Sequence, residues 1–282
     1  MYKLRELSTR NSGKHSPSEV NSYMKDLRAM MKQGKPCIGI FAVTASPAMV
    51  EAIGYSGLDF VIIDCEHAAL SAWGTELEEC VRAAYAADIT PIVRVTENDK
   101  GMILKALNFG AKGVIAPHIN TKEDAERMVR SARFAPEGRR SAAPPVRAAK
   151  YGFVPFPEFW KQQNKENLVI PLIEEKEAAQ DLAKILEVKG IDVLFYGPFD
   201  LSMTLGLDGV CDHPVIWKGL DDTVKLCKPK GIPVANLCWD IASAAESIKR
   251  GALMIAMSVD MVIFRQGLQA LTGRVEKELR NL

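Results

Sequence analysis

The sequence has little of what marks a protein that binds nucleic acid or membranes. Its 36 Lys and Arg are balanced by 35 Asp and Glu, giving a formal charge of +1, and the two signs are interspersed. Such a balance provides no basic field for a nucleic acid or an anionic membrane. No apolar run reaches the length of about 18 residues that a spanning helix needs, and residues 1–18 contain no apolar signal-peptide core. We therefore expect no nucleic-acid partner, no membrane partner and a cytoplasmic location.

Cysteine is too scattered to suggest a zinc site, a redox motif or a disulfide framework. No two of the six cysteines have the short spacing of a metal-binding or redox pair. We interpret them as reduced thiols, with Cys65 and Cys238 as small buried hydrophobic residues.

What the chain does contain is a repeated alternation of short apolar runs and amphipathic stretches. The run Phe60–Ile63 is typical of a strand buried on both faces, as in parallel sheets covered by helices. Runs of this kind predict strands at 37–43, 58–64, 91–95, 113–118, 168–173, 191–196, 232–236 and 252–258. Helical spacing and capping residues predict helices at 16–32, 46–55, 75–87, 99–109, 177–188, 213–230 and 240–250, and others beginning near 121 and 260.

Eight strand-then-helix units predict a (β/α)8 TIM barrel, whose active site lies in the loops that follow the strands. We expect one domain over residues 16–282, preceded by a flexible arm at 1–15. Only the proline-rich segment 134–167 breaks the alternation. A long irregular segment of this kind is usually a functional loop, so we expect short helical pieces there and a role in substrate specificity.

Polar side chains follow the carboxyl ends of five predicted strands. Because parallel strands of a barrel end at one mouth, these side chains are expected to meet there. Glu174 and Asp200 can together hold a hard divalent cation such as Mg²⁺ or Mn²⁺. The full set of candidates is Asp64, Glu66, His67, Arg94, His118, Glu174 and Asp200.

A cation flanked by arginine and histidine suits the cleavage of a 2-oxo acid. The cation acts as a Lewis acid for an enolate, Arg94 stabilises the developing charge on the oxo oxygen, and His67 moves the proton of a 4-hydroxyl group. No lysine ends these strands, which disfavours a Schiff-base aldolase.

Each candidate also has a structural interpretation. Asp64 and Glu66 can cap a turn or pair with Arg94, and His118 can be either a wall of the site or a catalyst. Glu174 can be the acidic first turn of a helix, and Asp200 can be a helix N-cap.

Four motifs in order resemble the HpcH/HpaI aldolase family, the metal-dependent class II pyruvate aldolases. They are residues 59–67, 91–94, 173–174 and 197–202. The resemblance implies Glu174 and Asp200 as metal ligands, Arg94 as the pyruvate-binding arginine and His67 as the catalytic histidine, with Asp64 also in the catalytic set. We expect substrate contacts at Arg94, Glu66, Leu172, Gly197 and Pro198, and Mg²⁺ or Mn²⁺ as the ion, with Co²⁺ as a further candidate.

The same resemblance implies a TIM barrel of the phosphoenolpyruvate/pyruvate type. Its last helix is exchanged between neighbours, and the homo-oligomer is a hexamer or a trimer of dimers. The chain departs from the family where it has Asn108 in place of an Asp that pairs with the histidine, and Leu172 in place of a Gln. His118 is similar to a histidine of macrophomate synthase, a family member that decarboxylates oxaloacetate.

These observations predict a divalent-metal-dependent lyase that cleaves or forms 4-hydroxy-2-oxo acids through a metal-bound pyruvate enolate. The first alternative is an oxaloacetate decarboxylase or a macrophomate-synthase-like enzyme that uses the same enolate and needs no base. The second is a metal-binding oligomeric barrel without catalysis.

Overall fold

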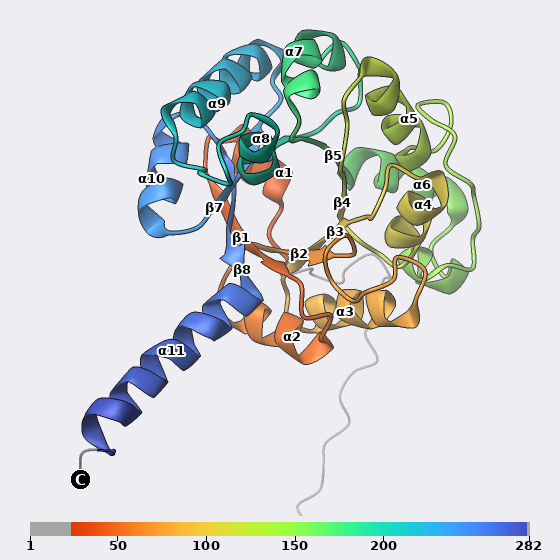
Figure 1. Ribbon diagram of the computed structural model, residues 1–282. Coiled ribbons are helices and arrows are strands. Elements are labelled where there is room, and N and C mark those ends of the chain that lie inside the picture. The colour runs from red at the N-terminus through yellow and green to blue at the C-terminus, as the bar shows by residue number, and fades with distance from the viewer. Residues whose placement is uncertain (1–23, 281–282) are drawn as a thin grey trace, which may run out of the picture.

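Eight parallel strands close into a barrel, in chain order, in the computed structural model, which describes residues 24–280 (Figure 1). The predicted (β/α)8 fold is therefore confirmed. The predicted arm 1–15 and the predicted helix start at residue 16 lie outside the described residues. The strands are β1 Cys37–Ala42, β2 Phe60–Asp64, β3 Thr90–Arg94, β4 Gly113–Ala116, β5 Leu168–Ile173, β6 Leu194–Tyr196, β7 Val234–Cys238 and β8 Met254–Val259.

Most of the helices form an outer ring around the strands, whereas α1 packs on the inner core of the barrel through Leu27 and Met31 and α11 extends away from it (Figure 1). They are α1 Leu27–Lys32, α2 Pro47–Tyr55, α3 Thr75–Ala86, α4 Lys100–Asn108, α5 Lys122–Ala132, α6 Phe156–Glu166, α7 Lys176–Ile185, α8 Pro198–Thr204, α9 Pro214–Cys227, α10 Ile241–Lys249 and α11 Asp260–Glu278, with short 3₁₀ turns η1 Arg147–Gly152 and η2 Lys228–Lys230. Helix α8 was not predicted, since its seven residues carry too short a pattern to show helical spacing.

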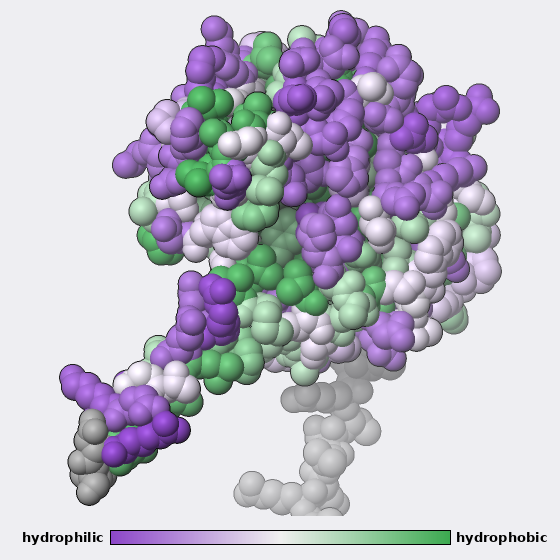
Figure 2. All heavy atoms as spheres, in the orientation of Figure 1, coloured by the Kyte–Doolittle hydropathy of each residue, from purple (hydrophilic) through white to green (hydrophobic). Residues whose placement is uncertain are grey.

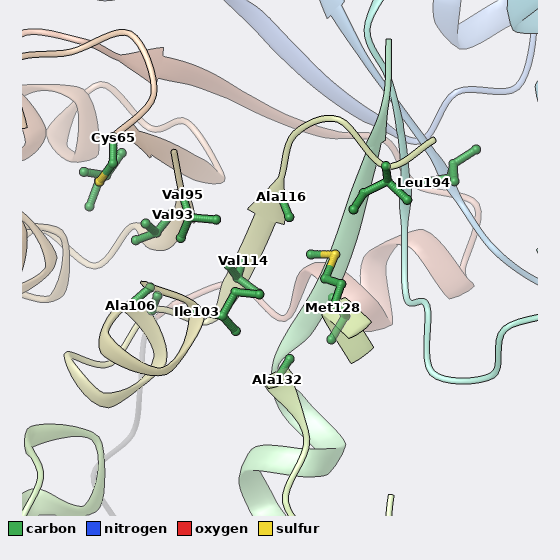
Figure 3. Packing of buried hydrophobic residues seen from close by; sticks show 14 of the residues in the cluster. Cys65, Val93, Val95, Ile103, Ala106, Val114, Ala116, Met128, Ala132 and Leu194 are labelled. Carbon is green, nitrogen blue, oxygen red and sulfur yellow. The ribbon is translucent and has the colours of Figure 1, made fainter. Parts of the chain in front are cut away.

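Strand side chains alternate between two hydrophobic cores, which explains the continuous apolar runs. In β2, Phe60 and Ile62 point into the barrel, where they pack with residues such as Phe195, whereas Val61 and Ile63 belong to the layer between strands and helices. Figure 3 shows part of this outer layer, with Val93 and Val114 facing Ile103 of α4. Both cores exclude water, so the polar groups at the strand ends have a rigid support.

The segment 134–167 does not lie over the mouth of its own barrel, so its predicted role in specificity is not supported within one chain. It starts where α5 ends, and Arg147 donates a hydrogen bond to the carbonyl of Phe109 at the end of α4 (2.6 Å). Phe134 packs edge-on against Phe159 (ring centroids 5.9 Å apart). Apolar packing and the three-turn helix α6 hold this segment on the outside of the barrel wall. Within one chain it therefore cannot contact a substrate at the strand ends.

Helix α11 extends away from the barrel and packs only at its beginning (Figure 1). Asp260, at that beginning, accepts hydrogen bonds from the backbone N–H groups of Val43 and Thr44 (3.0 and 3.2 Å). Further along, Phe264, Leu268 and Leu271 are about half exposed. Figure 2 shows hydrophobic side chains near the point where the helix leaves the barrel. No helix among residues 24–280 is long and apolar enough to cross a membrane.

Candidate active site

Arg94 is fixed at the mouth by two carboxylates that follow the neighbouring strand. Asp64 and Arg94 pair in register between β2 and β3, and the Asp64 carboxylate accepts from Nε and Nη2 of Arg94 at 2.8 and 2.7 Å. Nη1 lies 3.0 Å from Glu66 Oε2. Phe41 supports the guanidinium from inside the barrel, with its ring centroid 4.8 Å from Cζ. Arg94 is therefore a preorganised cation at the top of the barrel.

Asp64 has both structural roles that the sequence allowed, since it accepts a hydrogen bond in a turn and also pairs with Arg94. Its carboxylate also accepts from the backbone N–H of Glu66 (3.0 Å), and the residue is fully buried. Burial works against the charged form of Arg94, but the hydrogen bonds and charges of Asp64 and Glu66 outweigh it, so the pKa of Arg94 is raised. Burial likewise raises the pKa of Glu66, opposed by the charge of Arg94.

Glu174 is buried directly after β5, with its carboxylate turned toward the β4 end. Its Oε1 accepts from the backbone N–H of His118 (2.9 Å). Gly197 leaves the space that Glu174 occupies, because a Cβ at position 197 would lie 2.7 Å from Glu174 Cβ and 3.1 Å from Leu172 Cδ1. Pro198 follows as the first residue of α8. Of the predicted contact residues, Leu172 and Gly197 therefore lie near the Glu174 side chain, and Pro198 begins the next helix.

The acidic side chains around Glu174 suit a bound cation. Burial, together with the charges of Glu66 and Asp200, raises the pKa of Glu174 to about 7. Ligand atoms of Glu66, His118 and Glu174 all lie within 4.8 Å of one another. Asp200 is an exposed residue in the first turn of α8 and is not its N-cap, which is Gly197. Glu66, His118 and Glu174 are able to hold a metal ion, because a buried acid surrounded by other acids is stabilised by a cation. Asp200 is not part of this group of converging ligand atoms.

The two candidate histidines occupy different environments. His67 has an exposed side chain, and its Nε2 is 3.9 Å from Glu66 Oε2. His118 has a positive φ of 55°, and its Nδ1 lies 2.8 Å from Glu175 Oε1. Burial lowers the pKa of His118, but the hydrogen bond to Glu175 and the charges of Glu174 and Glu66 outweigh that effect, so its pKa is raised. Both rings flank Glu66 at the mouth.

Sequence reasoning missed Glu175 and Asn120. Glu175 was read only as part of an acidic helix start, yet its carboxylate contacts His118 and accepts from Asn120 Nδ2 (2.9 Å) instead of capping α7. The only sign of this role in the sequence was that Glu175 is a polar residue directly after Glu174. Asn108, at the end of α4, accepts from Arg140 Nη2 (2.9 Å). Helix α4 returns to the amino ends of the strands, so within one chain Asn108 lies at the opposite end of the barrel from His67.

Comparison with known proteins bears on the family of this chain. The sequence profile of the family HpcH/HpaI aldolase/citrate lyase matches residues 37–267. A 5-keto-4-deoxy-D-glucarate aldolase of Salmonella arizonae is 31% identical over 240 residues, covering 85% of this chain and 92% of the relative. A 4-hydroxy-2-oxo-heptane-1,7-dioate aldolase of Salmonella newport is 31% identical over 252 residues, covering 88% of this chain and 94% of the relative.

Solved structures show the same fold. An HpcH/HpaI aldolase from Desulfitobacterium hafniense superposes with a TM-score of 0.82 at 28% identity, over 90% of this chain and 97% of the other. Macrophomate synthase superposes with a TM-score of 0.75 at 24% identity, over 92% and 90% of the two chains. It is thus a structural neighbour, as the sequence suggested. The chain belongs to the HpcH/HpaI aldolase/citrate lyase family and is an enzyme of the lyase class.

Proposed function

We propose that this enzyme is a divalent-metal-dependent aldolase that cleaves or forms 4-hydroxy-2-oxo acids, with pyruvate as one product. The observation that carries the proposal is the buried Glu174 carboxyl group, whose pKa is raised to about 7 among other acids. In such surroundings the charged form of a carboxyl group is unfavourable by itself and is stabilised by a bound cation. Relatives named as aldolases of 2-oxo acids support the same reaction class.

Glu174 and Asp200 would hold Mg²⁺, Mn²⁺ or Co²⁺, with Glu66 and His118 close to the same ion. The Asp200 carboxylate forms no hydrogen bond or ion pair with any residue in the range 24–280, so it is free for this role. When bound, such an ion polarises the 2-oxo group of the substrate. Its oxygen ligands match the hard character of these cations.

Arg94 binds the oxo oxygen and stabilises the negative charge that forms there during cleavage. Asp64, Glu66 and Phe41 fix its orientation before the substrate arrives, so no reorganisation is needed during the reaction. Gly197 and Pro198 line the side of the site next to Glu174, and Leu172 forms its apolar floor. His67 and His118 contact the distal part of the substrate from either side of Glu66.

We further propose a homo-oligomer in which α11 is exchanged between neighbouring subunits, as in a hexamer or trimer of dimers. The support is the apolar side of α11, with Ile263, Phe264 and Leu271 half exposed on a helix that leaves its own barrel. The cytoplasmic location stays a prediction. It fits six free cysteines, of which five are buried.

Oxaloacetate decarboxylation is a second candidate, and the position of His67 favours it. No carboxylate of residues 24–280 lies within hydrogen-bonding distance of the His67 ring, and Asn108 replaces the expected acid. Loss of CO₂ from oxaloacetate yields an enolate without removal of a hydroxyl proton. A histidine at position 67 without a carboxylate partner therefore affects this route less than it affects aldol cleavage.

One assay tests both proposals. The enzyme is incubated with Mg²⁺ or Mn²⁺ and a 4-hydroxy-2-oxo acid or oxaloacetate, and pyruvate is followed with a coupled dehydrogenase. We expect pyruvate from the hydroxy-oxo acid, abolished by chelation and in Glu174→Ala and Asp200→Ala. Pyruvate from oxaloacetate alone would favour the decarboxylase, and none from either substrate would favour a barrel without catalysis. Full activity of both variants after chelation would refute the metal assignment.

A further inference from the structure

We propose that a cavity between β6, β7, α9 and α10 binds a small aromatic amine, a flat ring with a hydroxyl group at one end and an ammonium group at the other. The cavity has a volume of about 300 Å³, which is at the lower end of the range for small-molecule sites. Helices α9 and α10 both pack against β7 there (Figure 1). This site is independent of the aldolase function proposed above.

The cavity belongs to the outer layer of the barrel wall and not to the barrel interior. On β6, Phe195 points into the barrel, whereas the next residue, Tyr196, lies in the layer under the helices. On β7, Asn236 also points outward, since its Nδ2 donates to Ser247 Oγ of α10 (2.8 Å). Pro198, at the start of α8, is the one lining residue shared with the predicted substrate contacts. A ligand in the cavity therefore lies behind the wall of the active site.

Asn236 provides a buried polar group that a ligand can complete. The residue is 3% exposed and lines the cavity, and its Oδ1 has no hydrogen-bond partner among residues 24–280. Tyr196, its neighbour in register on β6, donates its hydroxyl to the carbonyl of Ile216 (2.8 Å) and not to this amide. An unpaired buried amide end is costly, so the site favours a ligand that pairs with it.

The open end of the Asn236 amide calls for a hydroxyl group on the ligand. Ser247 and Cys238 lie at the other end of the amide and can serve it in either orientation, because a hydroxyl and a thiol both donate and accept. One end of the amide is therefore left open whichever way it is turned. A phenol hydroxyl group can donate to an amide oxygen or accept from an amide nitrogen.

Aromatic side chains form the walls of the cavity. Trp217 on α9 and Trp239 after β7 line it together with Tyr196. Trp239 is held in place, since its Nε1 donates to Cys211 Sγ (3.4 Å) and its ring packs edge-on against Phe199 (centroids 6.2 Å apart). Such walls favour a flat ring, and an indole face also attracts a cation.

The charged residues of the cavity are acids. Asp212 and Asp240 line it and are exposed, so they stand at its rim, and no lysine, arginine or histidine in the described part of the chain lines it. Arg250 lies over the Trp217 ring but is already paired with two other acids, at 2.6 and 2.8 Å. An ammonium group suits this rim, whereas a carboxylate is repelled by it. The 2-oxo acids of the proposed reaction therefore do not suit this cavity.

Tyramine is the probe for this site, and two related compounds each lack one of its features. Phenethylamine lacks the hydroxyl group, and 3-(4-hydroxyphenyl)propionate carries a carboxylate in place of the ammonium group. In titration calorimetry with the wild type, tyramine should bind about 5–20-fold more tightly than phenethylamine, because only tyramine pairs with Asn236. The carboxylate compound should show no binding at the same concentrations.

Substitutions at the two ends of the cavity test each contact. Asn236→Leu should lower tyramine affinity to that of phenethylamine and change phenethylamine affinity by less than about twofold. Asp212→Asn should weaken both amines by about 2–5-fold. The control Asp208→Asn alters an acid of the same loop that does not line the cavity, at a positive φ that asparagine also adopts, and should change neither affinity. Circular dichroism checks that each variant is folded.

Cys211 locates the bound amine without any substitution. It is the only one of the six cysteines that is not buried, and it lines the cavity. Its alkylation by N-ethylmaleimide, followed by mass spectrometry, should slow by about tenfold when tyramine is present at ten times its Kd.

The site is wrong if tyramine leaves the alkylation rate of Cys211 unchanged. It is also wrong if the carboxylate compound binds as tightly as tyramine, or if a folded Asn236→Leu variant binds tyramine as well as the wild type does. None of these measurements uses a 2-oxo acid, so a failure of the proposed aldolase function would not alter their outcome.

Discussion

Asp64 and Arg94 stand side by side at the ends of two neighbouring strands and share two hydrogen bonds of 2.8 and 2.7 Å. The pairing follows directly from the parallel register of β2 and β3, so the fold itself orients the arginine. The remaining nitrogen, Nη1, reaches Glu66 at 3.0 Å. Any change at position 64 should therefore act through Arg94.

Asp64→Asn should reduce both stability and activity. Loss of one partner of a buried ion pair typically costs about 3–5 kcal/mol, and Glu66 compensates in part, so we expect a loss of about 3 kcal/mol in the free energy of unfolding. Denaturant unfolding measures it. The control Asp181→Asn removes an exposed pair with Lys184 and should change stability by less than about 0.5 kcal/mol. Equal effects of the two substitutions would contradict the structural role of Asp64.

Gly197→Ala should displace Glu174, because the added methyl group would lie 2.7 Å from Glu174 Cβ. Overpacking of this kind costs about 1–3 kcal/mol. We expect metal affinity, measured by calorimetry, to fall by about tenfold or more. Gly273→Ala in α11 is the control, since no atom lies within 4 Å of its added Cβ. Unchanged metal affinity in Gly197→Ala would show that Glu174 is not a ligand or can move freely.

Metal binding should strengthen as the pH rises toward 7 and then level off. The pKa of Glu174 is raised from 4.5 to about 7, so below that pH the ion must displace a proton. Affinity for Mn²⁺ should then fall by about tenfold for each pH unit below 7, and binding should release protons to the buffer. Titration calorimetry in buffers of different ionisation enthalpy measures both. A binding constant independent of pH between 5 and 7 would exclude Glu174 as the titrating ligand.

Phe264→Glu combined with Leu268→Glu should dissociate the oligomer. Both side chains are about half exposed on the part of α11 that leaves the barrel, and a buried interface does not tolerate two added carboxylates. Light scattering coupled to gel filtration should show the wild type as an oligomer and the variant as a smaller species with an intact circular dichroism spectrum. A wild-type monomer would overturn the proposed exchange of α11.

Much of the barrel could be predicted because it depends on local patterns. Short apolar runs ended by polar residues identified the strands, and the helix predicted to begin near 121 starts with the capping residue Thr121. The seven-residue α8 was too short to show periodicity. The segment 134–167 was expected near the substrate but lies on the outside of the barrel wall. Its proline content indicates irregular structure but does not determine on which side of the barrel the chain runs.

The sequence by itself determined the closed barrel, the end of the barrel where polar groups gather, and the family to which the enzyme belongs. These features follow from hydrophobic alternation and from motifs that are contiguous in the chain. Only the tertiary structure decided which side chains pair. Contacts between different units of the barrel hold His118 beside Glu174 and Glu175 and place Asp64 beside Arg94. The same packing separates Asn108 from His67. Such contacts depend on strand register and helix direction, which no local pattern encodes.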